Sequence, residues 1–160
     1  MNHTGIGYDI HRLVEGRKLV LGGVEIAHSR GLDGHSDADV LSHAIADALL
    51  GAVGERDIGH HFPNSDESIR GISSLDILKR VAEILGKKNA VIVNVDSTLI
   101  AEAPKIGPHL SAIRANLALA LNLPVERIGV KATTNERMGF LGRGEGIAAM
   151  AVASVEQADT

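Results

Sequence analysis

Apolar residues recur at helical spacing after residue 36 and predict a helix there. Its apolar stripe consists of Leu41, Ile45, Ala48 and Leu49. Polar residues recur at four-residue spacing on roughly the opposite face, at Asp39, His43 and Asp47. Ser36 is suited to be the N-cap of this helix, because Asp39 three residues later completes a capping-box pattern. We therefore expect an amphipathic helix whose polar face presents an imidazole.

The rest of the chain reads as strands mixed with helices. Gly22-Gly23 between two apolar runs predicts a hairpin over 18–26, and segment 55–71 has no clean period and is expected to be a long loop. The other predicted elements are strands 3–11, 90–101, 128–132 and 147–155, and helices 74–85 (ended by Gly86) and 104–121. This order predicts one domain, 1–160, of the α/β or α+β class, with a mixed β-sheet covered by helices.

Composition narrows the classes of function. The net charge of the 160 residues is −4 and only Tyr8, Phe62 and Phe140 are aromatic, which argues against nucleic-acid binding and against an anionic membrane surface. The absence of cysteine excludes disulfides and thiolate metal sites and fits a reducing compartment. No apolar run approaches the roughly 18 residues of a membrane span, and the N-terminus lacks the plan of a signal peptide. We expect a soluble, cytoplasmic protein.

Three residues suggest a metal site. Side chains two apart on a strand share a face, so Asp9 and His11 are expected to point the same way. His43 adds a second imidazole from the predicted helix. One oxygen and two nitrogen ligands suit a zinc-like ion with a fourth position left open for chemistry. An Asp-x-His pair can equally be polar surface, and the sequence does not show that strand and helix meet.

Two further segments are suited to phosphate. His35 and Ser36 stand where the chain enters the helix, whose N-terminal amides and dipole favour anions; a plain cap at Ser36 is the simpler explanation. The segment 133–146 contains Thr133, Thr134 and Glu136 among glycines and arginines, a set able to bind phosphate oxygens and a Mg²⁺ ion. It matches neither a Walker loop nor a dinucleotide fingerprint, and a structural turn between strands is the alternative.

These segments together resemble one family almost end to end, the 2-C-methyl-D-erythritol 2,4-cyclodiphosphate synthases of the non-mevalonate isoprenoid pathway. The matching motifs are Gly-Tyr-Asp-Ile-His-Arg (7–12), Gly-His-Ser-Asp-Ala-Asp-Val (34–40), Asp-Ile-Gly (57–59), Phe-Pro (62–63), Ala-Pro-Lys (103–105), Lys-Ala-Thr-Thr (131–134), Gly-Phe (139–140) and Gly-Arg-Gly-Glu-Gly (142–146). The resemblance implies a phosphorus–oxygen lyase that converts 4-diphosphocytidyl-2-C-methyl-D-erythritol 2-phosphate into the cyclic diphosphate and CMP. No external nucleophile is needed, so positioning and charge neutralisation would carry the catalysis.

The resemblance also assigns roles to residues. Zn²⁺ would be held by Asp9, His11 and His43, and Mg²⁺ or Mn²⁺ by Glu136. His35 and Thr134 would stabilise charge at the transferring phosphorus. The segment 101–107, with Lys105, would form the cytidine pocket, and Asp57, Gly59 and the loop 62–66 would hold the methylerythritol part. The other substrate-binding residues implied are Ile10, Ser36, Asp57, Ile58, Gly59, Phe62, Pro63, Asn64, Ser65, Asp66, Ala101, Pro104, Lys105, Ile106, Thr133 and Asn135.

The resemblance further implies a homotrimer with active sites between subunits. Phe140 and Arg143 would lie near the trimer axis, where some members bind an isoprenoid diphosphate. The chain departs from the usual family pattern at Asn64, at Ile106-Gly107 and at Leu141, the last of which would make the axial region more apolar.

Two other classes of function stay open at this stage. A metal-dependent phosphohydrolase would use the same Asp/His site to activate water and would need no cytidine pocket. A non-catalytic trimer that binds an isoprenoid diphosphate at Phe140 and Arg143 would need none of the metal ligands.

Overall fold

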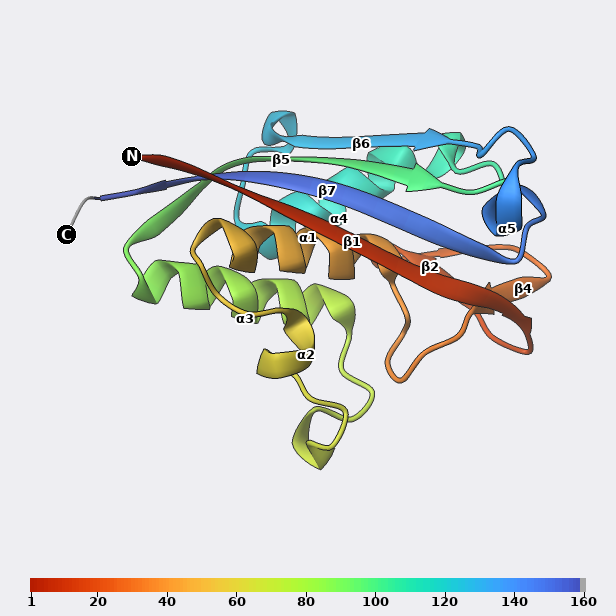
Figure 1. The fold of residues 1–160 in the computed structure, drawn as a ribbon, viewed down its shortest axis with the longest axis horizontal. Coiled ribbons are helices and arrows are strands. Elements are labelled where there is room, and N and C mark those ends of the chain that lie inside the picture. The colour runs from red at the N-terminus through yellow and green to blue at the C-terminus, as the bar shows by residue number, and fades with distance from the viewer. Residues whose placement is uncertain (159–160) are drawn as a thin grey trace.

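The computed structural model describes residues 1–158 and contains a five-stranded sheet with the long helices on one face (Figure 1). The elements are β1 (Asn2–Glu15), β2 (Leu19–Leu21), β3 (Val24–Ile26), β4 (Arg30–Leu32), α1 (Val40–Ala52), α2 (Ile58–His61), η1 (Glu67–Ile69), α3 (Ser74–Lys87), β5 (Ala90–Ile100), η2 (Gly107–His109), α4 (Leu110–Leu121), η3 (Val125–Arg127), β6 (Ile128–Thr133), α5 (Gly139–Gly142) and β7 (Gly146–Gln157). Within this described part, no helix is long and apolar enough to cross a membrane.

The sheet is mixed, as predicted. Its order is β4-β1-β7-β5-β6; β5 and β6 pair in parallel, and the other neighbours are antiparallel. The predicted hairpin is confirmed as β2–β3, with Gly22 and Gly23 at φ 55° and 71°, the positive values that a primed two-residue turn requires. The α+β class expected from the sequence is therefore confirmed.

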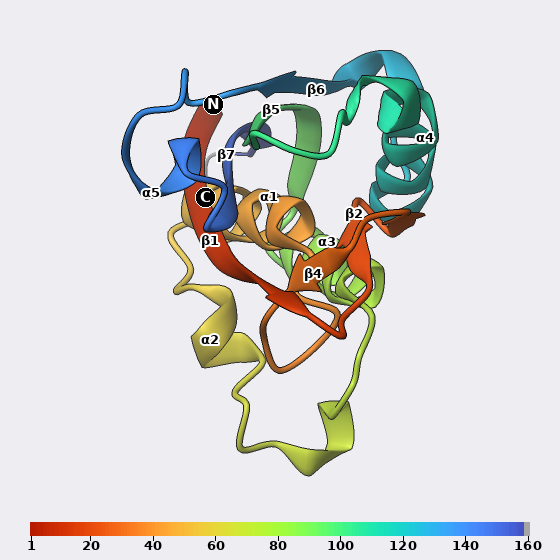
Figure 2. The ribbon, with the colours of Figure 1, turned by 90° about the vertical axis from the view of Figure 1, so that its right-hand side faces the viewer.

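Helix α1 is the centre of the core, and its predicted amphipathic character is wrong. Eleven of its 13 residues are buried, because β1 and β7 cover one side and α3 covers another (Figure 2). Asp39 and His43, which the spacing placed on a polar face, are buried too. A helix enclosed by other elements needs no solvent-facing stripe, so its polar residues require partners inside the protein.

The N-cap of α1 is Asp39, not Ser36. Ala38 has a positive φ of 53°, so the chain turns sharply just before the helix and Ser36 remains in the preceding loop. One carboxylate oxygen of Asp39 accepts from the backbone N–H of Ser42, and the carboxylate also accepts from the N–H groups of Gly22 and Gly23. The cap of α1 thereby also fastens the β2–β3 hairpin to the core.

Other boundaries differ from the prediction as well: β1 continues to Glu15 instead of ending at 11, and the short strand β4 was not predicted. Helix α3 continues through Gly86, and the chain reverses instead at Asn89, which has a positive φ of 55°. Helix α4 begins at Leu110 rather than at 104, and the residues just before it form the separate short turn η2 (Gly107–His109), in which Pro108 takes an early position where its missing N–H is not needed. The predicted long loop 55–71 contains two short helical turns, α2 and η1.

Candidate active site

Strand β1 presents two of the predicted metal ligands on the face that packs against α1. Alternate residues point that way: Gly5, Gly7, Asp9 and His11. A Cβ atom at Gly7 would overlap the carbonyl oxygen of Ala44, so the backbones of strand and helix approach directly. The prediction that Asp9 and His11 share a face is confirmed.

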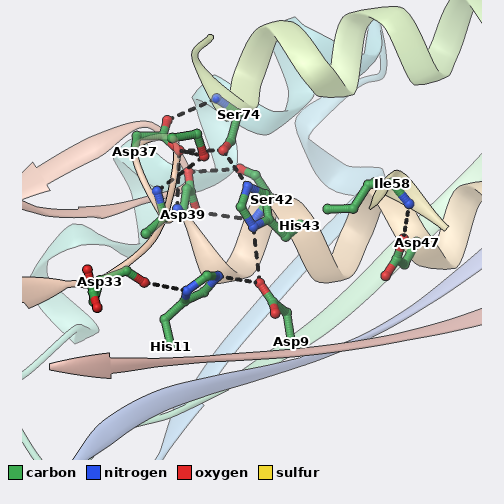
Figure 3. A network of polar contacts seen from close by, with 12 residues as sticks. Asp9, His11, Asp33, Asp37, Asp39, Ser42, His43, Asp47, Ile58 and Ser74 are labelled. Atoms are coloured by element: carbon green, nitrogen blue, oxygen red, sulfur yellow. Dashed lines mark hydrogen bonds and ion pairs between the residues drawn. The ribbon is translucent and has the colours of Figure 1, made fainter. Parts of the chain in front are cut away.

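Helix α1 supplies the third ligand and brings it into contact with the first. Nδ1 of His43 lies 3.1 Å from Oδ2 of Asp9, and Nε2 of His11 lies 3.0 Å from the same oxygen (Figure 3). One ligand atom from each of the three side chains lies within 4.8 Å of the others. The sequence left open whether strand and helix meet, and the structure places these three side chains together.

The charges in this cluster are strongly coupled. Burial alone raises the pKa of Asp9, but the contacts with His11 and His43 outweigh it and lower the pKa to about 2. The contact with Asp9 raises the pKa of His11. Asp9 is therefore a carboxylate at neutral pH, as a metal ligand must be.

In each imidazole, the ring nitrogen that points away from the cluster makes a hydrogen-bond contact elsewhere in the chain. The other ring nitrogen, which faces the cluster, is left to bind a metal. Nδ1 of His11 donates to the carbonyl oxygen of Asp33 at 2.6 Å, which leaves the lone pair on Nε2. That Nε2 atom is buried and, among residues 1–158, has no aligned hydrogen-bond partner despite its closeness to Asp9. Nε2 of His43 contacts the hydroxyl of Ser74 at 2.8 Å. The donor set of one carboxylate and two imidazoles fits a divalent ion of the zinc type.

The cluster opens into a cavity of about 670 Å³. Most of the predicted metal, phosphate and methylerythritol residues line it: Asp9, His11, His35, Ser36, His43, Ile58, Gly59, Phe62, Pro63, Asn64 and Asp66. Among the residues predicted from β1 and from 57–66, three do not line it. Ile10 lies on the opposite face of β1, Ser65 is exposed between two lining residues, and Asp57 uses its side chain to cap α2 through the N–H of His60.

A second, smaller pocket of about 320 Å³ lies at the ends of β5 and β6. It contains the predicted cytidine segment together with both threonines: Ala101, Pro104, Lys105, Ile106, Thr133 and Thr134. Glu102 lies within that segment, although no role of its own was predicted for it, and it accepts from the backbone N–H groups of Asn135 and Arg137. It thereby fixes the turn that carries Glu136, an exposed residue with a positive φ of 51°.

The larger cavity lies beside β1 and the smaller pocket lies at the ends of β5 and β6, with β7 between β1 and β5 in the sheet. Asp9 pairs with Ala149, Ala149 with Leu99, and Leu99 with Ala132, so β1 and β6 are three strand spacings apart at this level. That separation is roughly 14 Å. Within one chain, therefore, Thr134 does not line the cavity that holds His35 and the metal ligands.

The two residues predicted for a trimer axis lie in neither pocket. Phe140, on α5, is 48% exposed, and exposed Arg143 pairs through Nε with Oε1 of Glu145 at 2.7 Å. Leu141 between them is buried within the chain. Leu141 therefore adds little to the exposed surface of α5, and its effect on a trimer axis stays a prediction.

Sequence reasoning missed the residues that support the cluster from behind. Ser74 and Asp37 bond to each other and reach His43, yet they are 37 positions apart. The cavity also takes lining residues from 67–72 that carry no motif. One usable signal was present: the Gly5-x-Gly7 spacing inside a strand marks a close backbone approach directly beside Asp9.

The fold and the site define a class: an α+β protein with a carboxylate and two imidazoles assembled where a central helix meets a sheet. The chain belongs to the YgbB family, whose family model matches residues 2–156. It is 58% identical over 154 residues to the 2-C-methyl-D-erythritol 2,4-cyclodiphosphate synthase of Alkaliphilus metalliredigens (strain QYMF), covering 96% of this chain and 97% of the relative. The synthase of the same name from Thiobacillus denitrificans is 57% identical over 154 residues, covering 96% of each.

Solved structures agree with this assignment. The CDP complex of IspF from Plasmodium falciparum has a TM-score of 0.85 and 35% identity, covering 99% of this chain and 97% of that chain. The bifunctional IspDF of Campylobacter jejuni has a TM-score of 0.94 and 38% identity; the match covers 99% of this chain but 43% of the bifunctional one. The family resemblance drawn from the sequence is confirmed.

Proposed function

We propose that this protein converts 4-diphosphocytidyl-2-C-methyl-D-erythritol 2-phosphate into 2-C-methyl-D-erythritol 2,4-cyclodiphosphate and CMP in the non-mevalonate pathway, and that the whole chain acts as one synthase domain. An oxygen of the 2-phosphate forms a bond to the β-phosphorus, and the bond from that phosphorus to the CMP oxygen breaks, so CMP leaves with the electron pair. The observation that carries the proposal is the Asp9–His11–His43 cluster opening into the 670 Å³ cavity. It is the site expected for holding a phosphate oxygen in a family whose relatives bear this activity in their names.

The three clustered side chains would hold Zn²⁺, and Glu136 would hold Mg²⁺ or Mn²⁺. These ions would supply Lewis acidity and charge neutralisation for the phosphates. Histidine nitrogens with one carboxylate favour zinc, whereas an exposed carboxylate that shares its ion with substrate phosphates favours magnesium. The backbone turn held by Glu102 would keep Glu136 outside the pocket wall, where a diphosphate can reach it.

Substrate positioning would then be divided between the two pockets. In the larger cavity, Ser36 would bind phosphate and His35 would stabilise the charge that develops at the transferring phosphorus. Asp57, Ile58 and Gly59 would enclose the methylerythritol part together with the segment Phe62, Pro63, Asn64, Ser65 and Asp66. In the smaller pocket, Ala101, Pro104, Lys105 and Ile106 would hold cytidine, and Thr133, Thr134 and Asn135 would bind the diphosphate.

We propose that the working assembly is a homotrimer that joins a cavity of one subunit to a smaller pocket of the next. The separation of β1 from β6 supports this, because His35 and Thr134 cannot act on the same phosphorus within one chain. The outer face of the sheet supports it too. Ile6 faces Val152 and Tyr8 faces Met150 across β1 and β7, and all four are exposed, with Ile6 at 68%. Apolar pairs of this kind gain stability when a neighbouring subunit covers them.

Phe140 and Arg143 would bind a different ligand on that assembly. An exposed aromatic ring next to an exposed guanidinium suits a molecule with an apolar tail and a diphosphate, and an isoprenoid diphosphate at the trimer axis has this chemistry. The Glu145 carboxylate already engages Arg143, so the ligand would have to compete with that ion pair.

Phosphorus NMR of the purified protein with its proposed substrate, Zn²⁺ and Mg²⁺ tests the reaction. We expect two coupled resonances of a cyclic diphosphate and an equal amount of CMP. Asp9→Asn, which keeps the size of the side chain and removes its charge, is the matched control and should give neither product at a comparable rate. Inorganic phosphate in place of the cyclic product would indicate the hydrolase, and a folded, zinc-loaded protein without turnover would contradict the synthase.

A further inference from the structure

The hydroxyl of Ser74 lies between a metal-ligand histidine and a second carboxylate. Ser74 is the first residue of α3 and is fully buried. Its Oγ is 2.8 Å from Nε2 of His43 on one side and hydrogen-bonded to Oδ1 of Asp37 on the other (Figure 3). The backbone N–H of Ser74 donates to the other oxygen of Asp37 at 2.9 Å. Three segments of the chain therefore meet behind the imidazole.

The direction of these hydrogen bonds follows from counting protons. An ionised carboxylate only accepts, so the single hydroxyl proton of Ser74 is donated to Asp37. The hydroxyl then offers His43 a lone pair, and Nε2 of His43 must carry the proton of that contact. When the ring is neutral, its lone pair is consequently on Nδ1, the atom that faces Asp9.

Capping of α3 does not account for the hydroxyl of Ser74. The N-cap of α3 is Ser73, whose own side chain accepts from the N–H of Leu75. The contacts of Ser74 Oγ within residues 1–158 are His43 and Asp37. The Ser74 hydroxyl therefore hydrogen-bonds to the His43 imidazole and to Asp37, and it does not cap its own helix.

We infer that Ser74 and Asp37 are positioning residues that set the tautomer and ring orientation of His43 and so hold Nδ1 ready for the metal. The inference rests on the proposed function, since it takes Asp9, His11 and His43 as the metal ligands. Outer partners of this kind orient ligand imidazoles in metal sites generally, and their loss weakens metal affinity by about 10–100-fold. The carbonyl of Asp33 serves His11 in the same way, but it is backbone and survives any substitution there.

Two variants separate this role from a structural one. Ser74→Ala removes the acceptor for Nε2. Asp37→Asn keeps the size of the side chain but has one accepting oxygen for two Ser74 donors. Two backbone N–H groups reach this carboxylate, that of Ser74 on Oδ2 at 2.9 Å and that of Asp39 on Oδ1 at the longer 3.2 Å. We expect the single amide oxygen to stay with the shorter contact, so that the amide NH₂ faces the hydroxyl. The hydroxyl then donates to Nε2 of His43 and moves the ring proton to Nδ1, the metal-binding atom.

The experiment measures zinc affinity by competition with a chromophoric chelator, and the His43 tautomer from ¹⁵N shifts of the metal-free protein. Ser73→Ala, which loses a hydroxyl from the neighbouring position, is the matched control. We expect Ser74→Ala to bind zinc about 10–100-fold more weakly, Asp37→Asn to lose at least as much and to shift His43 toward the Nδ1–H form, and Ser73→Ala to match the wild type.

Each other result has a definite meaning. Wild-type protein that binds no zinc overturns the metal site itself and, with it, this inference. The positioning role alone is overturned if the wild type binds zinc and the folded Ser74→Ala and Asp37→Asn variants bind it equally well, with an unchanged ¹⁵N pattern. Should Ser74→Ala fail to fold, the isosteric Asp37→Asn decides by the same two measurements.

Discussion

Gly7 on β1 lies against the backbone of Ala44 on α1 with no side chain between them. Asp9 follows two residues after Gly7 on the same face, and His43 precedes Ala44 on the helix. The close approach of the two backbones is therefore what allows a short aspartate side chain to reach the imidazole at 3.1 Å. The contact between Gly7 and Ala44 therefore serves both the packing of β1 on α1 and the geometry of the Asp9–His43 pair.

Gly7→Ala should push the strand and the helix apart. The new methyl would overlap the Ala44 carbonyl, so we expect a loss of several kcal/mol in the free energy of unfolding or no folded protein. Gly51→Ala on the same helix is the control, because the nearest atom to its Cβ would be 3.9 Å away. That variant should be as stable as the wild type or gain up to about 1 kcal/mol. Urea denaturation compares the two, and a fully stable Gly7→Ala would contradict the close contact.

Asp39→Ala should be far more damaging than Ser36→Ala. The Asp39 carboxylate accepts from the N–H groups of Gly22, Gly23 and Ser42 and from the Ser42 hydroxyl, and all four donors would lose their acceptor. We expect a loss of about 3 kcal/mol or more for Asp39→Ala, since each unsatisfied buried group costs about 1–3 kcal/mol. Ser36 is not the cap, so its alanine variant should lose less than about 1 kcal/mol. Equal losses would contradict the observed cap.

His43→Ala should abolish metal binding while leaving a folded chain. The side chain is 11% exposed, so its removal leaves a small cavity and costs about 1–3 kcal/mol. Loss of a ligand should weaken zinc affinity and activity beyond the about 100-fold of an outer-partner substitution. Zinc content and turnover are measured against His60→Ala, which removes an exposed imidazole outside the cluster. A zinc-free His43→Ala protein with full activity would contradict the metal assignment.

Asp47→Asn tests the electrostatics one turn further along α1. Burial raises the pKa of Asp47 above its ordinary 3.8, although its hydrogen bond from Ile58 opposes the shift; the charges of Asp57 and Asp9 raise it further. A raised carboxyl pKa means that the ionised form disfavours the folded state. That cost is present at neutral pH and disappears as the pH falls through the raised pKa to 3.8.

We therefore expect Asp47→Asn to be more stable than the wild type at neutral pH, with an advantage that shrinks on acidification. The amide oxygen can still accept from Ile58 N–H, which lies 2.8 Å from Oδ1 in the wild type. Asp47→Ala loses that acceptor and should be about 1 kcal/mol less stable than Asp47→Asn. Urea titrations from neutral pH down to 3.8 measure both, and an advantage that grows in acid would contradict the burial effect.

Local patterns predicted most of the longer strands, because each of these carries its own signal, but they missed the short strand β4 and the end of β1. The hairpin at Gly22-Gly23 and the shared face of Asp9 and His11 depend on turn chemistry and on a period of two, and both are confirmed. The start of α1 was misplaced because Ser36 has the right residue type, whereas the positive φ at Ala38 follows from the fold. The burial of His43 was missed for the same reason. Helical spacing shows which residues share a face of a helix, but it does not show which other elements pack against that face.

The site was predictable where residues are close in sequence and unpredictable where they are distant. Asp9 and His11 are neighbours on one strand, but the support of His43 by Ser74 spans 31 positions and has no local signature. The family resemblance named the residues of both pockets, yet only the sheet order places them three strands apart. The distance between two strands of a sheet depends on the order in which the strands pair, and local sequence patterns do not give that order.

Because α1 is enclosed by other elements, some residues near the site are needed for folding and others only for catalysis. Only the second kind can show whether a related sequence is still active. Gly7 and Asp39 are required for packing, so a descendant that had lost catalysis would still have to keep them in order to fold. Asp9 and His11 are partly exposed and support no core contact of that kind, so they are free to drift once selection for catalysis ends. We therefore expect retention of this pair, rather than of the motif around the helix start, to distinguish relatives that still carry out catalysis.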